Sequence, residues 1–397
     1  MALVASNITG CSSKTGSGSK GTGKGGKIKI VTTIFPEYDW VKEIVKGNDK
    51  AEVSFLLNNG VDLHSFQPSA EDILQIGLAD VFIYVGGESD EWVEDALKEV
   101  KNKDIKVINL MEVLKDSVKE EEMVEGMEEH DHEHEHEDAD HEDADHEDHD
   151  DADVDHDDAD ADHEDADHED HDDADADHDN ADHEDHDDAD ADHEDADHEE
   201  HEHHHEEGEV EYDEHVWLSL RFAKVICETI TEKVSEADPS NKSLYEKNFE
   251  DYRNKLTDLD EKYEKLFEES ENKTILFGDR FPFRYMIDDY DLKYYAAFAG
   301  CSAESEASFE TITFLSEKVD ELSLNAIFQI ETSDGKIAET IKDNTKSKDQ
   351  EILTLDSLQS TTSKDVEDGK SYLKAMEDNY VVLDKAFGSG DAAKKNS

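Results

Sequence analysis

Short apolar runs alternate with helical patterns through the first part of the chain. Residues 28–34, 53–57, 81–85 and 105–110 are apolar runs of strand length. Helical patterns follow the first two of them. Because parallel strands are joined by helical crossovers, this alternation predicts a parallel α/β sheet. A first α/β lobe is therefore expected in residues 27–118.

Residues 211–238 also contain a helical pattern, and they are expected to complete the first lobe. The apolar residues Leu218, Phe222, Val225 and Thr229 recur there at spacings of three and four. This spacing places all of them on one side of a helix.

The clearest periodicity in the chain lies in residues 239–272. Seven apolar residues are separated alternately by four and three positions, namely Tyr245, Phe249, Tyr252, Leu256, Leu259, Tyr263 and Leu266. They predict one helix of about 22 residues, about 33 Å long at 1.5 Å per residue. Three heptads leave a coiled coil open, and a single helix packed across two lobes fits the pattern at least as well.

A second α/β lobe is expected in residues 273–390, followed by a tail of residues 391–397. Its expected strands are residues 274–277, 294–298, 326–330 and 352–355, with helical segments such as 308–318 between them. The fold class is therefore α/β, with two parallel-sheet lobes joined by one long rigid helix. A binding site in such a fold belongs in the cleft between the lobes.

An acidic, histidine-rich run separates the two parts of the first lobe, in residues 119–210. Between His130 and His205 the chain holds 20 of its 22 histidines and 42 Asp and Glu residues, without any Lys or Arg. The segment 138–153 recurs identically at 160–175. This composition has little to bury and repels itself, so we expect it to be disordered without metal.

The acidic run is expected to collect metal weakly at many sites. Representative ligands at its two ends are His130, His132, His134, His136, His201, His203, His204 and His205. Its carboxylates could also hold calcium, and a solvated insert with no specific role is the simplest alternative. The formal net charge of −72 argues against nucleic acid as a partner, because phosphates would be repelled, and it suits cations.

The beginning of the chain, residues 1–26, predicts a signal remnant, a lipobox and a flexible tether. Small residues precede Cys11, where a diacylglycerol could attach to the thiol, although an incidental cysteine is the alternative. Residues 12–26 are rich in Gly, Ser and Lys. We therefore expect a protein anchored only by lipid on the extracytoplasmic face of a bacterial cell membrane. It is also expected to be a monomer.

The other two cysteines, Cys227 and Cys301, either pair or remain separate thiols. No CxxC pair is present, so neither a cysteine zinc knuckle nor a redox dithiol is expected. The sequence also has no nucleophile elbow, phosphate loop or HExxH motif. We therefore do not expect an enzyme.

Two isolated histidines and two acidic residues are candidates for one defined metal site. His64 follows the second expected strand, and His215 stands where the chain returns from the acidic run. Asp279 and Glu331 follow strands at the matching edge of the second lobe. Two imidazoles with one or two carboxylates suit zinc and also manganese.

Four motifs carry a resemblance to a known family. VTTIFP at 31–36, GVDLHSFQPS at 60–69, LADVFIYVG at 78–86 and DEHVWLS at 213–219 resemble the zinc/manganese solute-binding lipoproteins of bacterial ABC importers (cluster A-I). The resemblance extends to about residue 388. It implies two lobes bridged by a rigid helix, with metal between them, and a His/acid-rich loop of the kind found in zinc-uptake members. It also implies His64 and His215 as ligands.

The same resemblance leaves the remaining ligands open. Relatives have His at the third position in zinc binders and Glu in manganese binders. Direct alignment places Gly278 there, and a shift of one residue gives Asp279, which is our prediction. Glu331 matches an acidic position that supplies a fourth ligand in some members, with Asp334 as its rival and Glu306 as a further candidate.

Together these features predict a binding lipoprotein that captures Zn²⁺ and delivers it to the membrane subunit of an ABC permease. The imidazole content of the acidic run favours zinc, whereas Asp279 as a ligand would favour Mn²⁺. A manganese-binding homologue is therefore one alternative. The other is a surface adhesin or metal buffer in which the acidic run is the working part.

Overall fold

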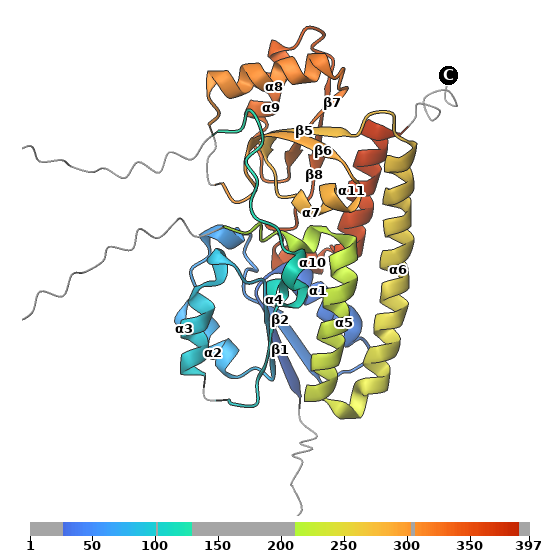
Figure 1. The fold of residues 1–397 in the computed structure, drawn as a ribbon. Helices are drawn as coiled ribbons and strands as arrows, with labels where there is room; N and C mark the ends of the chain where they lie inside the picture. Colours follow the sequence, from blue (N-terminus) through green and yellow to red (C-terminus); the bar gives the residue numbers. More distant parts are fainter. Residues whose placement is uncertain (1–26, 101, 129–210, 303–305, 389–397) are drawn as a thin grey trace, which may run out of the picture. The chain divides into compact units, whose positions relative to one another are not determined.

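Two parallel β-sheets, each of four strands, organise the part of the chain that the structure describes (Figure 1). The computed structural model describes residues 27–100, 102–128, 211–302 and 306–388. All of these residues fall in one unit of the chain. The acidic histidine-rich run from 129 to 210, the first 26 residues and the tail after 388 lie outside the described residues.

The first sheet has the strand order β2-β1-β3-β4. Its strands are β1 (Ile28–Thr32), β2 (Ala51–Phe55), β3 (Val81–Tyr84) and β4 (Lys106–Asn109). Its helices are α1 (Phe35–Ile44), α2 (Ala70–Gly77), α3 (Trp92–Glu99), α4 (Leu110–Leu114) and α5 (Leu220–Ala237). The central strands β1 and β3 are the most deeply buried, because helices cover both faces of the sheet (Figure 1).

The second sheet has the order β6-β5-β7-β8. Its strands are β5 (Thr274–Arg280), β6 (Lys293–Phe298), β7 (Ala326–Ile330) and β8 (Glu351–Leu355). Its helices are α7 (Arg284–Asp289), α8 (Phe309–Glu321), α9 (Lys336–Asn344), α10 (Ser363–Glu367) and α11 (Tyr372–Phe387). Strand β5 was predicted to end at Phe277 but continues to Arg280, with an irregular register between these two residues.

Helix α6 (Lys242–Glu269) joins the two lobes, and at 28 residues it is longer than predicted. All seven residues of the apolar stripe are buried, together with Phe267. The helix lies beside α1 and α5 of the first lobe and beside α11 of the second (Figure 1). The stripe therefore packs against helices of the same chain, as expected for a single helix packed across two lobes. The predicted fold class is confirmed.

Helix α5 (Leu220–Ala237) forms where a helix was predicted, and most of its buried side chains lie off the face named from the sequence. Val225 is 46% exposed, whereas Ala223, Ile226, Cys227 and Ile230 are buried. The helix begins at Leu220, where the side chain of its N-cap residue accepts a hydrogen bond from a backbone N–H of the first turn. Two stripes at helical spacing are present in this segment. The small residues Ala223 and Cys227 belong to the one that is buried.

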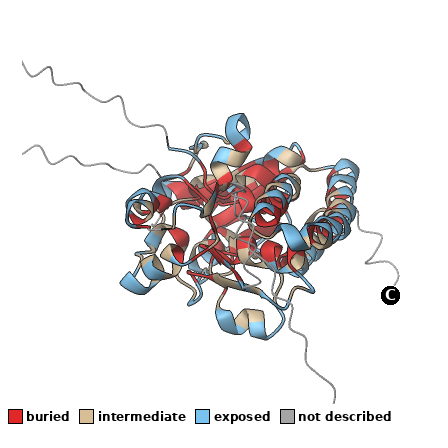
Figure 2. Ribbon diagram, turned by 90° about the horizontal axis from the view of Figure 1, so that it is seen from below, coloured by how far each residue is buried: buried red, intermediate tan, exposed pale blue. Residues whose placement is uncertain are grey.

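One large hydrophobic core runs through both lobes (Figure 2). It includes Trp40 of α1, Tyr263 of α6 and Tyr372 of α11. The Trp40 and Tyr372 rings meet edge to face at 5.0 Å. Among the described residues, no helix combines the length and the apolar character that a membrane span requires.

The beginning of the predicted acidic run packs against the folded body. Glu120 forms an antiparallel bridge with Tyr212, and the backbone N of Glu128 donates a 3.0 Å hydrogen bond to the carbonyl of Ala297. Met127 is buried. Residues 119–128 therefore belong structurally with the lobes, and a deletion of the acidic run should begin after residue 130.

Candidate metal centre

His64 lies beyond the carboxyl end of β2, in a 3-10 turn formed by Leu63–Ser65. The Asp62 carboxylate starts this turn by accepting a 3.1 Å hydrogen bond from the backbone N of His64. Since β2 is parallel to its neighbours, its carboxyl end lies at the edge where such sheets bind ligands. The fold thus brings His64 to the expected edge.

His215 is fully buried immediately before a second 3-10 turn, Val216–Leu218. Its backbone N donates a 2.8 Å hydrogen bond to Oδ1 of Asp213. The neighbouring Trp217 ring packs at 5.2 Å and donates from Nε1 to the carbonyl of Ser357, which follows β8 in the second lobe. His215 is therefore held in place by contacts from both lobes.

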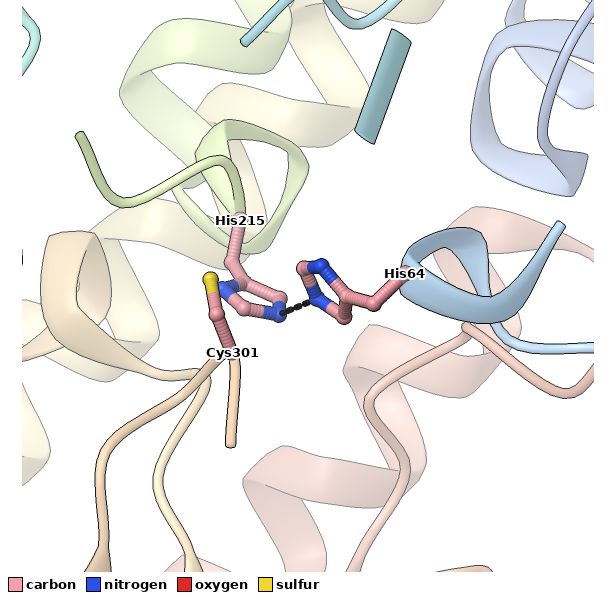
Figure 3. A group of neighbouring side chains, drawn as sticks. All are labelled: His64, His215 and Cys301. Carbon is pink, nitrogen blue, oxygen red and sulfur yellow. Dashed lines mark hydrogen bonds between the residues drawn. The ribbon is translucent and has the colours of Figure 1, made fainter. Parts of the chain in front are cut away.

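The two imidazoles point toward each other, with their Nε2 atoms 3.3 Å apart (Figure 3). Nδ1 of His215 lies 2.9 Å from Oδ1 of Asp213, a carboxylate that only accepts, so Nδ1 carries the proton. Nδ1 of His64 lies 2.8 Å from Oγ of Ser89 and 3.6 Å from the Glu214 carboxylate, which favours the same tautomer. In the neutral rings, both Nε2 lone pairs therefore face the same point.

This spacing matches a shared tetrahedral ion. Two imidazole nitrogens bound to one zinc at about 2.0 to 2.1 Å are about 3.3 to 3.4 Å apart. The side-chain partners of the two Nδ1 atoms are the kind that orient metal-binding histidines. Burial, and then the neighbouring His215, lower the pKa of His64 to about 4, so this ring is neutral and ready to bind at neutral pH.

Gln359 adds a further acceptor to the same place. When its amide NH₂ donates to the two Asp62 carboxylate oxygens, at 3.1 and 2.6 Å, its amide oxygen lies 2.7 Å from Nε2 of His215. When Nε2 of His215 carries a proton, it donates this hydrogen bond to the Gln359 oxygen, and a cation that binds the nitrogen replaces that proton.

The comparison with known families identifies the chain. The family model described as the periplasmic component A of the zinc-uptake complex matches residues 30–386. The chain belongs to this zinc-uptake family. Its members are extracytoplasmic zinc-binding proteins of ABC zinc-uptake systems, and the family is one of metal-binding transport proteins, not of enzymes.

Individual relatives agree with this assignment. The chain is 27% identical over 377 residues to the high-affinity zinc uptake system protein ZnuA of Bacillus subtilis, covering 95% of this chain and 92% of that protein. It is 27% identical over 363 residues to the zinc-binding lipoprotein AdcA of Streptococcus pneumoniae strain R6. That match covers 90% of this chain but 55% of AdcA, so the chain spans about half the length of these streptococcal relatives.

Solved structures share the fold. The Zn(II)-bound ZnuA-like domain of S. pneumoniae AdcA matches with a TM-score of 0.58 and 23% identity, over 92% of this chain and 100% of that one. The metal-dependent lipoprotein YcdH of B. subtilis matches with a TM-score of 0.60 and 23% identity, over 91% and 99%. A laminin-binding adhesin of Streptococcus agalactiae matches with a TM-score of 0.60 and 20% identity, over 91% and 99%. At these identities the likeness shows the fold alone.

The structure places the two predicted carboxylate ligands outside the group formed by the histidines. Asp279 lies within β5, where its carboxylate accepts hydrogen bonds from the backbone N of Arg280 at 2.8 Å and of Ile330 at 3.3 Å. Glu331 accepts from the backbone N and Oγ of Ser357, at 2.7 and 2.9 Å, and from Oγ of Ser360 at 3.1 Å. Both carboxylates therefore link loops and strands of the second lobe, and their role as ligands stays a prediction.

The other acidic candidates are also engaged or exposed. Asp334 forms an ion pair with Lys336 at 2.5 Å, and Glu306 is exposed. At Gly278, an added Cβ would lie 2.6 Å from Cα of Ala338 in α9. Helix α9 thus packs so closely on β5 that this position has no room for an imidazole.

Cys301 is the residue of the site that sequence reasoning missed. Within the described residues, His64, His215 and Cys301 each place one potential donor atom within 4.8 Å of the others (Figure 3). Cys301 follows β6, which ends at Phe298, so the rule that ligands gather at the carboxyl ends of parallel strands could have found it. The sequence left Cys227 and Cys301 either paired or separate, and in the structure both thiols are free.

Several predicted residues lie outside the described residues. They are the lipidation candidate Cys11 and the histidines of the acidic run, His130, His132, His134, His136, His201, His203, His204 and His205. Their assignments stay predictions.

Proposed function

We propose that this protein binds one zinc ion tightly between its two lobes and delivers it to the membrane permease of an ABC importer. One observation supports this most directly. The Nε2 atoms of His64 and His215 lie 3.3 Å apart while their Nδ1 atoms are occupied by protein partners. The pair is thus preorganised to bind a tetrahedral ion, and the names of the relatives specify zinc.

The buried position of the pair suits capture followed by controlled release. His215 is fully buried, and the side chain of His64 is 15% exposed. A bound ion would therefore be shielded from water, which strengthens its attraction to the donors. Release then requires displacement of a loop, and docking onto a permease would supply the energy for it.

The remaining donors of the site belong to the same proposal. We retain Asp279 and Glu331 as predicted ligands from the second lobe, because both lie near the carboxyl ends of their strands. For either to bind zinc, its carboxylate must exchange hydrogen bonds to backbone amides for the metal. Zinc binding by either carboxylate would therefore break hydrogen bonds within the second lobe.

The proposal also includes the cellular setting. A diacylglycerol on Cys11 would hold the protein on the extracytoplasmic face of the membrane, and residues 12–26 would act as its tether. Relatives named as lipoproteins support this anchor. The protein would act as a monomer, and its histidine-rich run would concentrate zinc near the tight site.

Zinc binding in competition with a chelator tests the proposal, because the chelator keeps weak sites empty. We expect one tight site in the full chain and its loss in His64→Ala, since removal of one imidazole leaves too few donors. Deletion of residues 131–207, replaced by a Gly/Ser linker, should keep the tight site and slow its loading. Tight binding that survives in His64→Ala but disappears in the deletion would show that the acidic run is the working part.

A further inference from the structure

We propose that the thiolate of Cys301 is a ligand of the bound zinc, together with Nε2 of His64 and Nε2 of His215. This inference rests on the proposed function, because it concerns the same ion. It goes beyond the ligands that the resemblance implied, none of which is sulfur.

The fold brings Cys301 to the histidine pair from the opposite lobe. The residue follows β6 by one short turn, and its potential donor atom lies within 4.8 Å of a donor atom on each histidine. Figure 3 shows its sulfur beside the His215 ring, next to the ring nitrogen that does not face His64. An added Cβ on the preceding Gly300 would lie 3.1 Å from Cε1 of His215, so the glycine lets the Cys301 backbone approach the ring closely.

The side chains at the end of β5 have other partners. Gly278 is packed against Ala338, and Asp279 bonds to backbone amides. Arg280 then directs its guanidinium to the Asp62 carboxylate in the first lobe. The guanidinium of Arg280 is a cation and cannot bind zinc, so a further donor from another strand end of the second lobe would complete the site. Cys301 at the end of β6 is placed to do so.

The chemistry of binding is balanced by the loss of one proton. Zinc accepts lone pairs from both Nε2 atoms without displacing hydrogen, whereas the S–H bond of Cys301 breaks as the Zn–S bond forms. The released proton passes to solvent. A site of two imidazoles and one thiolate selects zinc over manganese, because thiolate is a soft ligand and manganese prefers oxygen.

X-ray absorption of the full chain loaded with equimolar zinc tests the proposal. We expect a Zn–S distance of about 2.3 Å in the wild type and only Zn–N and Zn–O distances in Cys301→Ser. Affinity should fall by more than the roughly 10- to 100-fold typical of changes outside the ligand shell. Cys227→Ala, at the buried thiol of α5, and Cys11→Ser should both keep the Zn–S distance.

The variants also separate this inference from the proposed function. A tight site without sulfur in the wild type, lost in His64→Ala, would overturn the thiolate ligand while supporting zinc capture. Loss of sulfur only in Cys11→Ser would also overturn it. Replacing zinc with cobalt gives a second readout, because thiolate-to-cobalt charge transfer should appear in the wild type and in Cys227→Ala but not in Cys301→Ser. Circular dichroism before metal addition identifies any variant that fails to fold.

Discussion

At the scale of single residues, the orientation of each imidazole is set by the partner of its Nδ1 atom. Asp213 holds Nδ1 of His215, and Ser89 with Glu214 faces Nδ1 of His64. These partners fix the rings with Nε2 turned inward before any ion arrives. The two imidazole rings are therefore already oriented for a shared ion, and neither ring would have to turn for an ion to bind.

Glu37 is a second residue whose environment differs from that of an ordinary carboxyl. It is fully buried in the first turn of α1, where it accepts hydrogen bonds from the backbone N of Thr33 and of Ile34. Burial, and then the charge of Asp90, raise its pKa from 4.5 to about 8, against the opposing effect of those hydrogen bonds. The folded protein thus keeps a proton that the unfolded chain loses.

This difference predicts a pH-dependent stability. Below pH 4.5 Glu37 is protonated in both states, and above about pH 8 it is ionised in both, so its contribution to stability falls as pH rises between these values. Relative to Glu37→Gln, the metal-free wild type should lose up to about 1.4 kcal/mol per pH unit in this range. Urea unfolding at about pH 5 and about pH 8 measures this loss. Equal pH dependence in both proteins would contradict it.

At the scale of elements, the ends of the strands decide which side chains reach the site. Strand β5 continues past its predicted end, and the irregular register between Phe277 and Arg280 directs Asp279 to the amide of Ile330. Strand β6 ends at Phe298, just before Cys301. A shift of a few residues in a strand end thus changes which residue faces the histidine pair.

The apolar stripe of α6 predicts the cost of a cavity in the joining helix. Leu256 is fully buried, in the stripe that packs against helices of both lobes. Leu256→Ala should lower the free energy of unfolding by about 2 to 5 kcal/mol, because the surroundings fill the cavity only partly. Lys265→Ala, at a side chain that is 72% exposed on the same helix, should change it by less than about 0.5 kcal/mol. Urea unfolding of the metal-free proteins compares them, and similar losses would argue against the stripe as the core-facing side.

At the scale of the whole molecule, α6 is not the only connection between the lobes. The backbone N of Tyr372, at the start of α11, donates to the Asp39 carboxylate of α1 at 2.9 Å, and its hydroxyl donates to the carbonyl of Trp217 at 2.7 Å. The continuous core includes these residues. The lobes are thus packed together at these contacts, which favours local loop movements over hinge opening.

The ion pair between Arg280 and Asp62 joins the two lobes beside His64. Arg280→Gln should speed zinc dissociation by roughly tenfold or more, because it removes one partner of a mostly buried pair that holds the His64 turn. Stopped-flow transfer of zinc to a chelator measures this rate. Arg253→Gln, which removes an exposed pair with Glu250 on α6, should leave the rate unchanged. An unchanged rate in Arg280→Gln would mean that the pair does not restrain the turn.

The sequence by itself determined the fold class and the histidine pair. Apolar periodicity identified the strands and the joining helix because local burial follows directly from the spacing of apolar residues. His64 and His215 could be singled out because the other 20 histidines share one acidic run. The resemblance to metal-binding lipoproteins then placed both in one site, and family membership confirmed zinc-binding transport.

Only the tertiary structure decided which residues of the second lobe approach that pair. Asp279 and Glu331 stand at strand ends in the sequence, but their carboxylates bond to neighbouring backbone and hydroxyl groups. Cys301 has no motif around it that marks a ligand, yet the parallel order β6-β5 brings it beside His215. Strand registers and the packing of α9 on Gly278 depend on contacts between distant segments. Local sequence patterns do not predict such contacts between segments that are far apart in the chain.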